Sequence, residues 1–115
     1  MPWDIEMTDA CQAWYDDLSE DDAARVTAAI DYLAEQGPSA KRPVVGKIEG
    51  SKQTNLKELI AGNFRVLFAF GPDRAAILLV GGDKSQAGWK AWYRGAIKQA
   101  EEELDEILKA RRSPK

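Results

Sequence analysis

Two apolar runs lie in the middle of the chain, at residues 64–70 and 75–80, and are joined by the segment 71–74, GPDR. Because Gly, Pro and Asp favour tight turns, this pattern predicts a β-hairpin. The second run has almost no polar position, as expected of a strand that is buried on both faces in the middle of a sheet. We therefore expect this hairpin to form the core of the fold.

Arg65 stands out because it is a charged residue within the apolar run 64–70. Strand alternation places it on one face with Leu67 and Ala69, while the aromatic residues of the run share the other face. A cation in so apolar a strand needs a partner or contact with water, since burying it unpaired is costly. Arg65, and Lys84 just beyond the second run, are therefore candidate functional cations.

A preceding strand is predicted at residues 55–60, and it turns at residues 61–63 into the hairpin. The sequence leaves the pairing register open. A two-residue turn at residues 62–63 places Glu58 opposite Leu67, on the face of Arg65, whereas a three-residue turn places Lys57 there instead.

The N-terminal part of the chain predicts a strand followed by two helices. Residues 3–7 alternate between apolar and acidic side chains, which is typical of a strand with one wet face. Thr8 and Ser19 are suited to cap the two helices, and the second helix is expected to stop at Gly37. Cys11 falls on an inward apolar stripe, so we interpret it as core filler. Residues 37–54 are mostly irregular, with a possible short strand near residues 44–48.

A C-terminal helix is predicted to begin near Gly88, with an apolar stripe that packs on the sheet. Trp89 is expected in the core, and Tyr93 has a hydroxyl that could point into a site. The element order is then β-α-α-β-β-β-α, an α+β fold with helices covering one face of the sheet. Residues 1–110 form a single domain, and residues 111–115 are expected to be a frayed basic tail.

Composition narrows the chemistry. The 115 residues suffice for one domain, and no run of about 18 apolar residues predicts a membrane span. The lone Cys11 cannot form an internal disulfide, which fits a reducing cytoplasm. The chain has no histidine, and this removes the usual general base near neutral pH and the commonest metal ligand. No metal-binding spacing or dinucleotide motif is present, so no cofactor is expected.

Charge is strongly segregated along the chain. Residues 1–36 hold ten acidic residues against a single Arg, for a net charge of −9, whereas residues 37–100 carry +7 and residues 101–115 carry −1. This pattern indicates an anionic partner for the middle segment. The alternative is a sheet protein whose acidic helices simply face solvent.

Three segments in order carry a family resemblance: residues 56–59 (LKEL), residues 64–70 (FRVLFAF) and residues 78–84 (LLVGGDK), with residues 92–94 (WYR) following. Together they resemble the RelE/HigB superfamily of bacterial toxins, in particular its phage-related HigB-like branch. The resemblance implies a RelE-like fold, in which a small, mainly antiparallel sheet carries an N-terminal helical hairpin and a C-terminal helix.

The resemblance also implies a function. Such a chain would be the toxin of a type II toxin–antitoxin system, neutralised by a cognate antitoxin that often has a helix-turn-helix domain. The freed toxin would act on the ribosome and cleave mRNA without metal, by making the ribose 2′-OH attack the adjacent phosphate.

The same resemblance points to site residues. Arg65 falls at the position of the family's strand Arg, Tyr93 at that of the tyrosine opening the last helix, and Lys84 in the basic segment after the last strand. Without histidine, proton transfer would fall to Glu58, Lys57 or Tyr93. We expect the sheet to carry Arg65 and Lys84 to one concave surface clear of the helices, with Tyr93 nearby. Further candidate RNA-binding cations are Lys47, Lys52, Lys90 and Arg94.

One departure from the family pattern supports an alternative. An Arg commonly follows Glu-Leu in this branch, and Ile60 stands in its place. A catalytically weak or inactive homologue that acts as an antitoxin-binding regulatory module therefore remains open. A small cytoplasmic protein with no RNA role, whose cations merely pair with its acids, is a second alternative.

Overall fold

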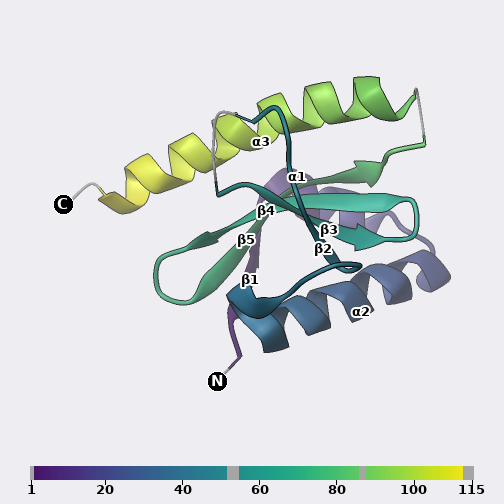
Figure 1. Cartoon of the computed structure of the whole chain (residues 1–115), viewed down its shortest axis with the longest axis horizontal. Helices are drawn as coiled ribbons and strands as arrows, with labels where there is room; N and C mark the ends of the chain where they lie inside the picture. Colours follow the sequence, from purple (N-terminus) through teal and green to yellow (C-terminus); the bar gives the residue numbers. More distant parts are fainter. Residues whose placement is uncertain (1, 52–54, 86–87, 113–115) are drawn as a thin grey trace.

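The computed structural model describes residues 2–51, 55–85 and 88–112, which form one mixed sheet with helices packed on it (Figure 1). The elements run in the order β1 (Asp4–Met7), α1 (Asp9–Asp16), α2 (Glu20–Gln36), the short 3₁₀ helix η1 (Gly37–Ser39), β2 (Val45–Lys47), β3 (Lys57–Ala61), β4 (Phe64–Gly71), β5 (Ala75–Asp83) and α3 (Trp89–Arg112).

The sheet of the described residues has five strands in the order β1-β5-β4-β3-β2. β1 pairs with β5 in parallel, and every other neighbouring pair is antiparallel. The α+β class and the mainly antiparallel sheet are thus confirmed. Compared with the predicted order, the sheet gains the short edge strand β2, where the sequence allowed a strand.

The helix caps form as their residue types dictate. The Thr8 side-chain oxygen accepts a hydrogen bond from the Cys11 N–H at 3.1 Å, and that of Ser19 accepts one from the Asp22 N–H at 3.2 Å. α2 ends at Gly37, whose φ of 55° favours glycine. Cys11 is 1% exposed, which confirms it as core filler.

The helices cover both faces of the sheet, so the expectation that they cover one face is wrong. α1 and α2 pack on the face that carries Phe68 and Leu78. α3 packs on the opposite face, which carries Leu67 and Ile77 (Figure 1). The physical reason is that β4 and β5 are apolar on both sides, so each face needs its own covering layer.

The register between β3 and β4 follows the two-residue turn at Gly62 and Asn63. Glu58 lies opposite Leu67, as that alternative required, and Ile60 lies opposite Arg65. Gly62 adopts a φ of 61°, a conformation that glycine reaches without steric cost. This register places the carboxylate of Glu58 on the same face of the sheet as Arg65.

The C-terminal helix extends beyond the domain boundary expected at residue 110. α3 continues to Arg112, and the Arg111 side chain forms an ion pair with Glu6 on β1. Residue 111 is therefore part of the fold, while residues 113–115 lie outside the described part of the chain. No helix among the described residues is both long and apolar enough to cross a membrane.

Leu104→Ala tests the packing of α3 on the sheet. Leu104 is fully buried, so truncation should lower the free energy of unfolding by about 2–5 kcal/mol. The exposed Lys98 on the same helix supplies the control, since Lys98→Ala should change stability by less than about 0.5 kcal/mol. Urea unfolding measures both, and equal effects of the two substitutions would contradict the described packing.

Candidate functional site

A carboxylate, a phenol and a guanidinium meet where β3 and β4 pass beneath the first turns of α3. The Tyr93 hydroxyl donates a hydrogen bond to Glu58 Oε1 at 2.5 Å. Arg65 Nε lies 3.7 Å from the same oxygen. The side chains of Arg65 and Glu58 are each 12% exposed, so this ion pair is largely shielded from solvent. A buried carboxylate with two such partners is held in a defined orientation.

Arg65 lies on the face that α3 covers, so the expected helix-free surface for this residue is wrong. Its Nη1 donates hydrogen bonds to the carbonyl oxygens of Gly62, at 2.6 Å, and Phe64, at 2.9 Å. On β5 its cross-strand partner is Gly82, and the Trp92 indole of α3 stands over that glycine. The Nε of Arg65 is buried without a hydrogen bond. In this conformation the Arg65 guanidinium makes its hydrogen bonds to groups of the protein itself.

The pKa of Tyr93 is raised to about 12. Burial is the largest cause, followed by the hydrogen bond to Glu58 and the negative charge of that carboxylate, while Arg65 acts in the opposite direction. The phenol therefore keeps its proton at neutral pH. Tyr93 can donate a hydrogen bond or a proton there, and it is unsuited to act as a base.

A pocket of about 320 Å³ opens beside the Glu58–Tyr93 pair. Lys47 and Glu49 contribute charged groups to it, Ile48 and Ile97 contribute apolar walls, and Trp89 stands with 55% of its surface exposed. The prediction that Trp89 belongs to the core is wrong. The apolar spacing of α3 is regular, but the Trp89 ring at the start of the helix contacts Tyr93 and Lys90 rather than the core of the sheet.

Aromatic rings and a cation gather at the start of α3. The Trp89 and Tyr93 ring centroids lie 6.3 Å apart, edge to face, and those of Trp92 and Tyr93 lie 5.0 Å apart. Lys90 Nζ lies 5.6 Å from the Trp89 ring centroid. An exposed indole with a cation beside it is suited to stack a nucleobase next to a phosphate. Sequence reasoning missed Trp89 because helical spacing alone assigned it to the core.

The remaining candidate residues do not join this cluster. Lys57 alternates with Glu58 along β3 and lines a separate pocket, which it shares with Lys47 and Arg42. Lys84 follows the end of β5, where its N–H donates to the Asn63 carbonyl oxygen at 3.1 Å. Arg94 is an exposed residue of α3. Lys52 lies outside the described residues.

The chemistry available at the site is therefore that of a carboxylate, a neutral phenol and a guanidinium beside an aromatic shelf. Within residues 2–51, 55–85 and 88–112, no three His, Cys, Asp or Glu side chains gather in a way that could hold a metal ion. Glu58 is the available proton acceptor and Tyr93 the available donor.

Tyr93→Phe tests the shielded Glu58–Tyr93 pair through its pH dependence. The folded chain holds the Tyr93 proton more tightly than the unfolded chain, which titrates near the ordinary value of 10.0. The resulting stabilisation is fully present below about pH 10 and is lost as the pH rises toward 12. Wild type should therefore lose stability relative to Tyr93→Phe over this window in urea unfolding.

Spectrophotometric titration gives a second measurement of the same pair. Tyr93→Phe should remove the tyrosine that ionises near pH 12, while Tyr32→Phe should leave it in place. Glu58→Gln should lower the pKa of Tyr93, because it removes a negative charge that favours the protonated phenol. A late ionisation that persists in Tyr93→Phe would contradict the assignment.

Comparison with solved structures shows the fold. The chain matches the archaeal RelE in a RelE–RelB complex from Pyrococcus horikoshii with a TM-score of 0.61 and 19% identity, covering 76% of this chain and 100% of that one. It matches a mutant of the E. coli toxin RelE in the free state with a TM-score of 0.61 and 8% identity, over 85% and 96% of the two chains. The RelE-like fold expected from the sequence is confirmed.

Comparison with protein sequences shows the family. Two Mycobacterium tuberculosis proteins named as toxins are similar to the chain. HigB3 is 44% identical over 99 residues, covering 84% of this chain and 86% of HigB3. HigB2 is 41% identical over 101 residues, covering 84% of this chain and 50% of HigB2. The family model described as Phage derived protein Gp49-like (DUF891) matches residues 13–105. The chain therefore belongs to the Gp49-like family, whose members are of the RelE/HigB type.

Proposed function

We propose that the chain is the toxin of a type II toxin–antitoxin system and that it cleaves mRNA on the ribosome. Its relatives HigB3 and HigB2 are named as toxins, and a RelE–RelB complex shares its fold. The observation that carries the proposal is the hydrogen bond between Tyr93 and Glu58 at a pocket with an exposed tryptophan. A proton acceptor and a proton donor thus lie together where an RNA chain could be held.

The proposed reaction needs only these side chains for its proton transfers. The ribose 2′-OH attacks the adjacent phosphorus, and its proton passes to the Glu58 carboxylate. The bond from phosphorus to the 5′-oxygen breaks, and that oxygen takes a proton from Tyr93. The products are a 2′,3′-cyclic phosphate and a free 5′-OH. The Glu58–Tyr93 hydrogen bond then returns the proton from the carboxyl group to the phenolate, which restores both residues.

Substrate binding falls to the groups around the pocket. Trp89 offers an exposed ring on which a base can stack. Lys47, Lys90 and Arg94 supply positive charge for phosphates. Lys84 and Lys57 do not line this pocket, so they would bind phosphates of the RNA at a greater distance from it. A phenol with so high a pKa is a weak acid, so orientation of the mRNA by the ribosome would have to supply much of the acceleration.

Arg65 has a positioning role in this proposal. Its Nη1 is bonded to two backbone carbonyls and its Nε faces Glu58. The guanidinium thus holds in place the carboxylate that would accept the 2′-OH proton. Arg65 therefore acts on the reaction through Glu58.

The proposed partners follow from the charge map. The ribosome and its mRNA are anionic and would meet the +7 middle segment of the chain. A cognate antitoxin, with a helix-turn-helix domain for operator binding, would shield this segment with acidic residues during storage. The site of action is then the cytoplasm.

A second candidate function is an inactive homologue that binds antitoxin and serves regulation. One specific observation favours it. Ile60 lies opposite Arg65 at the position where the family pattern has an Arg. At this point the strand pair therefore carries only the Arg65 guanidinium, and that group donates a hydrogen bond to the Gly62 carbonyl oxygen. The two candidates differ in whether expression of the chain alone stops growth.

Glu58→Gln and Tyr93→Phe test the proposed chemistry. Each removes one half of the proton-transfer pair, so mRNA cleavage by ribosomes with purified protein should fall by about 10²–10⁴-fold. Induction of either variant should no longer arrest growth. Tyr32→Phe, which removes a hydroxyl on α2, is the matched control and should behave as wild type. Cleavage by both variants at the wild-type rate would contradict the mechanism, and lack of cleavage by wild type would favour the inactive homologue.

Arg65→Ala should abolish toxicity and also lower stability. The substitution leaves the largely buried Glu58 carboxylate without its cation, so the free energy of unfolding should fall by about 3 kcal/mol. In Arg65→Ala/Glu58→Gln most of this stability should return while activity stays lost. Lys84→Ala should reduce toxicity less, because Lys84 makes a point-charge contact that other cations can share. A fully stable, inactive Arg65→Ala would point to direct phosphate binding instead.

A further inference from the structure

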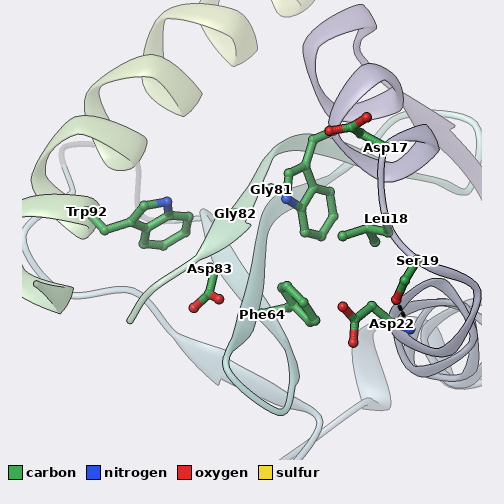
Figure 2. A pocket seen from close by; sticks show the side chains of 10 residues that line it. Asp17, Leu18, Ser19, Asp22, Phe64, Gly81, Gly82, Asp83 and Trp92 are labelled. Carbon is green, nitrogen blue, oxygen red and sulfur yellow. Dashed lines mark hydrogen bonds between the residues drawn. The ribbon is translucent and has the colours of Figure 1, made fainter. Parts of the chain in front are cut away.

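A second and larger groove, of about 540 Å³, lies at the far end of β5 (Figure 2). The turn between α1 and α2 forms one side of it, with Asp17, Leu18 and Ser19, and Asp22 follows in the first turn of α2. Trp92 of α3 lines the other side, and Phe64 lies between them in Figure 2. The proposed RNA cleavage uses none of these side chains.

The floor of the groove is the unpaired end of a strand. β1 pairs with β5 only as far as Leu78, so Gly81 and Gly82 have no strand neighbour on that side among the described residues. A Cβ on Gly81 would lie 2.3 Å from the Trp14 ring, and one on Gly82 would lie 2.4 Å from the Trp92 ring. The two glycines thus let two indoles pack closely against the end of the strand, Trp14 on one face of the sheet and Trp92 on the other.

The polar groups of the groove are acidic. In the described part of the chain, the carboxylates of Asp17 and Asp22 accept no hydrogen bond and form no ion pair. Asp83 Oδ1 accepts hydrogen bonds from the Ser85 hydroxyl, at 2.6 Å, and the Ser85 N–H, at 2.9 Å, and these bonds lower the pKa of Asp83. Figure 2 shows the Asp83 and Asp22 carboxylates on either side of Phe64. All three acids are therefore available to a cation.

We propose that this groove binds an arginine side chain of a protein partner. A guanidinium is planar, so it can stack on the Trp92 or Trp14 indole while its N–H groups reach the Asp22 and Asp83 carboxylates. A lysine ammonium is a strongly hydrated point charge that cannot use the flat walls in this way. Among the described residues, no Lys or Arg lines this groove, whereas Lys47 lines the proposed RNA pocket.

The groove also adjoins the candidate site. Trp92 lines the groove, Tyr93 lines the RNA pocket, and the two rings are in edge contact. Arg25 of α2 lines the neighbouring recess with Asp22 and Asp83, and no ion pair joins it to either acid in the residues that the structure describes. A partner's arginine would therefore bind carboxylates beside Trp92, whose ring contacts that of Tyr93.

The test uses the four tryptophans as internal reporters. The indole N–H resonances of the ¹⁵N-labelled chain are followed by NMR during titration with N-acetyl-arginine amide. Saturable shifts are expected at Trp14 and Trp92, with Trp3 and Trp89 unchanged because their rings lie outside the groove. N-acetyl-citrulline amide, which has the same shape without the charge, should produce no saturable shift, and N-acetyl-lysine amide should bind more weakly.

Matched variants locate the binding site. Asp22→Asn and Asp83→Asn should each weaken arginine binding by about threefold to tenfold. Asp31→Asn, an equal charge change on the exposed side of α2, should alter it by less than about twofold, and Arg25→Ala should strengthen it. Two independent acids keep the test decisive if one variant fails to fold. The proposal is overturned by equal binding of citrulline or lysine, by shifts spread over all four indoles, or by equal weakening in Asp31→Asn.

Discussion

Burial of β4 and β5 on both faces is the constraint from which the rest of this structure follows. The two strands form the centre of the sheet, and their side chains are apolar on each side. One helical layer cannot cover two faces, so α1 and α2 pack on one and α3 on the other (Figure 1). A charged residue in such a strand must then be neutralised within the protein, because water reaches neither face freely.

Arg65 shows how that requirement creates a site. The residue lies under the start of α3, and the register that the Gly62 turn imposes places it beside Glu58. Glu58 in turn engages the Tyr93 hydroxyl, and burial beside a carboxylate raises the pKa of that phenol. The core must pair the buried cation of Arg65 with a carboxylate. The pair that satisfies this need brings Glu58 and the neutral phenol of Tyr93 into contact beside a pocket.

Local features of the fold could be predicted from the sequence because their causes are local. Thr8 and Ser19 cap helices through hydrogen bonds to residues three positions away, and Gly62 permits a turn by its own conformation. The predictions that failed concern which helices cover which face of the sheet and which distant side chains come together. The apolar pattern of β5 indicated burial on both faces, yet which helix supplies the second layer depends on long-range packing. Trp89 continues the helical stripe of α3, but it is largely exposed and lies outside both core clusters of the described residues. Lys57 is adjacent to Glu58 in sequence, but strand alternation turns its side chain away. Lys84 follows the strand that pairs with the strand of Arg65, but it lies past the end of β5 and does not line the pocket.

The start of α3 brings two different sites into contact. The first turns of that helix carry Tyr93 toward a pocket with Lys47 at its wall, and Trp92 toward a groove with Asp22 and Asp83. Neighbouring residues of one helix thus face two different sites, with their rings in contact. Because each aromatic ring packs against the other, a ligand that shifts one indole would press on the phenol that holds Glu58. The two proposed functions, recognition of a protein partner and of RNA, would therefore be linked through this one side-chain contact.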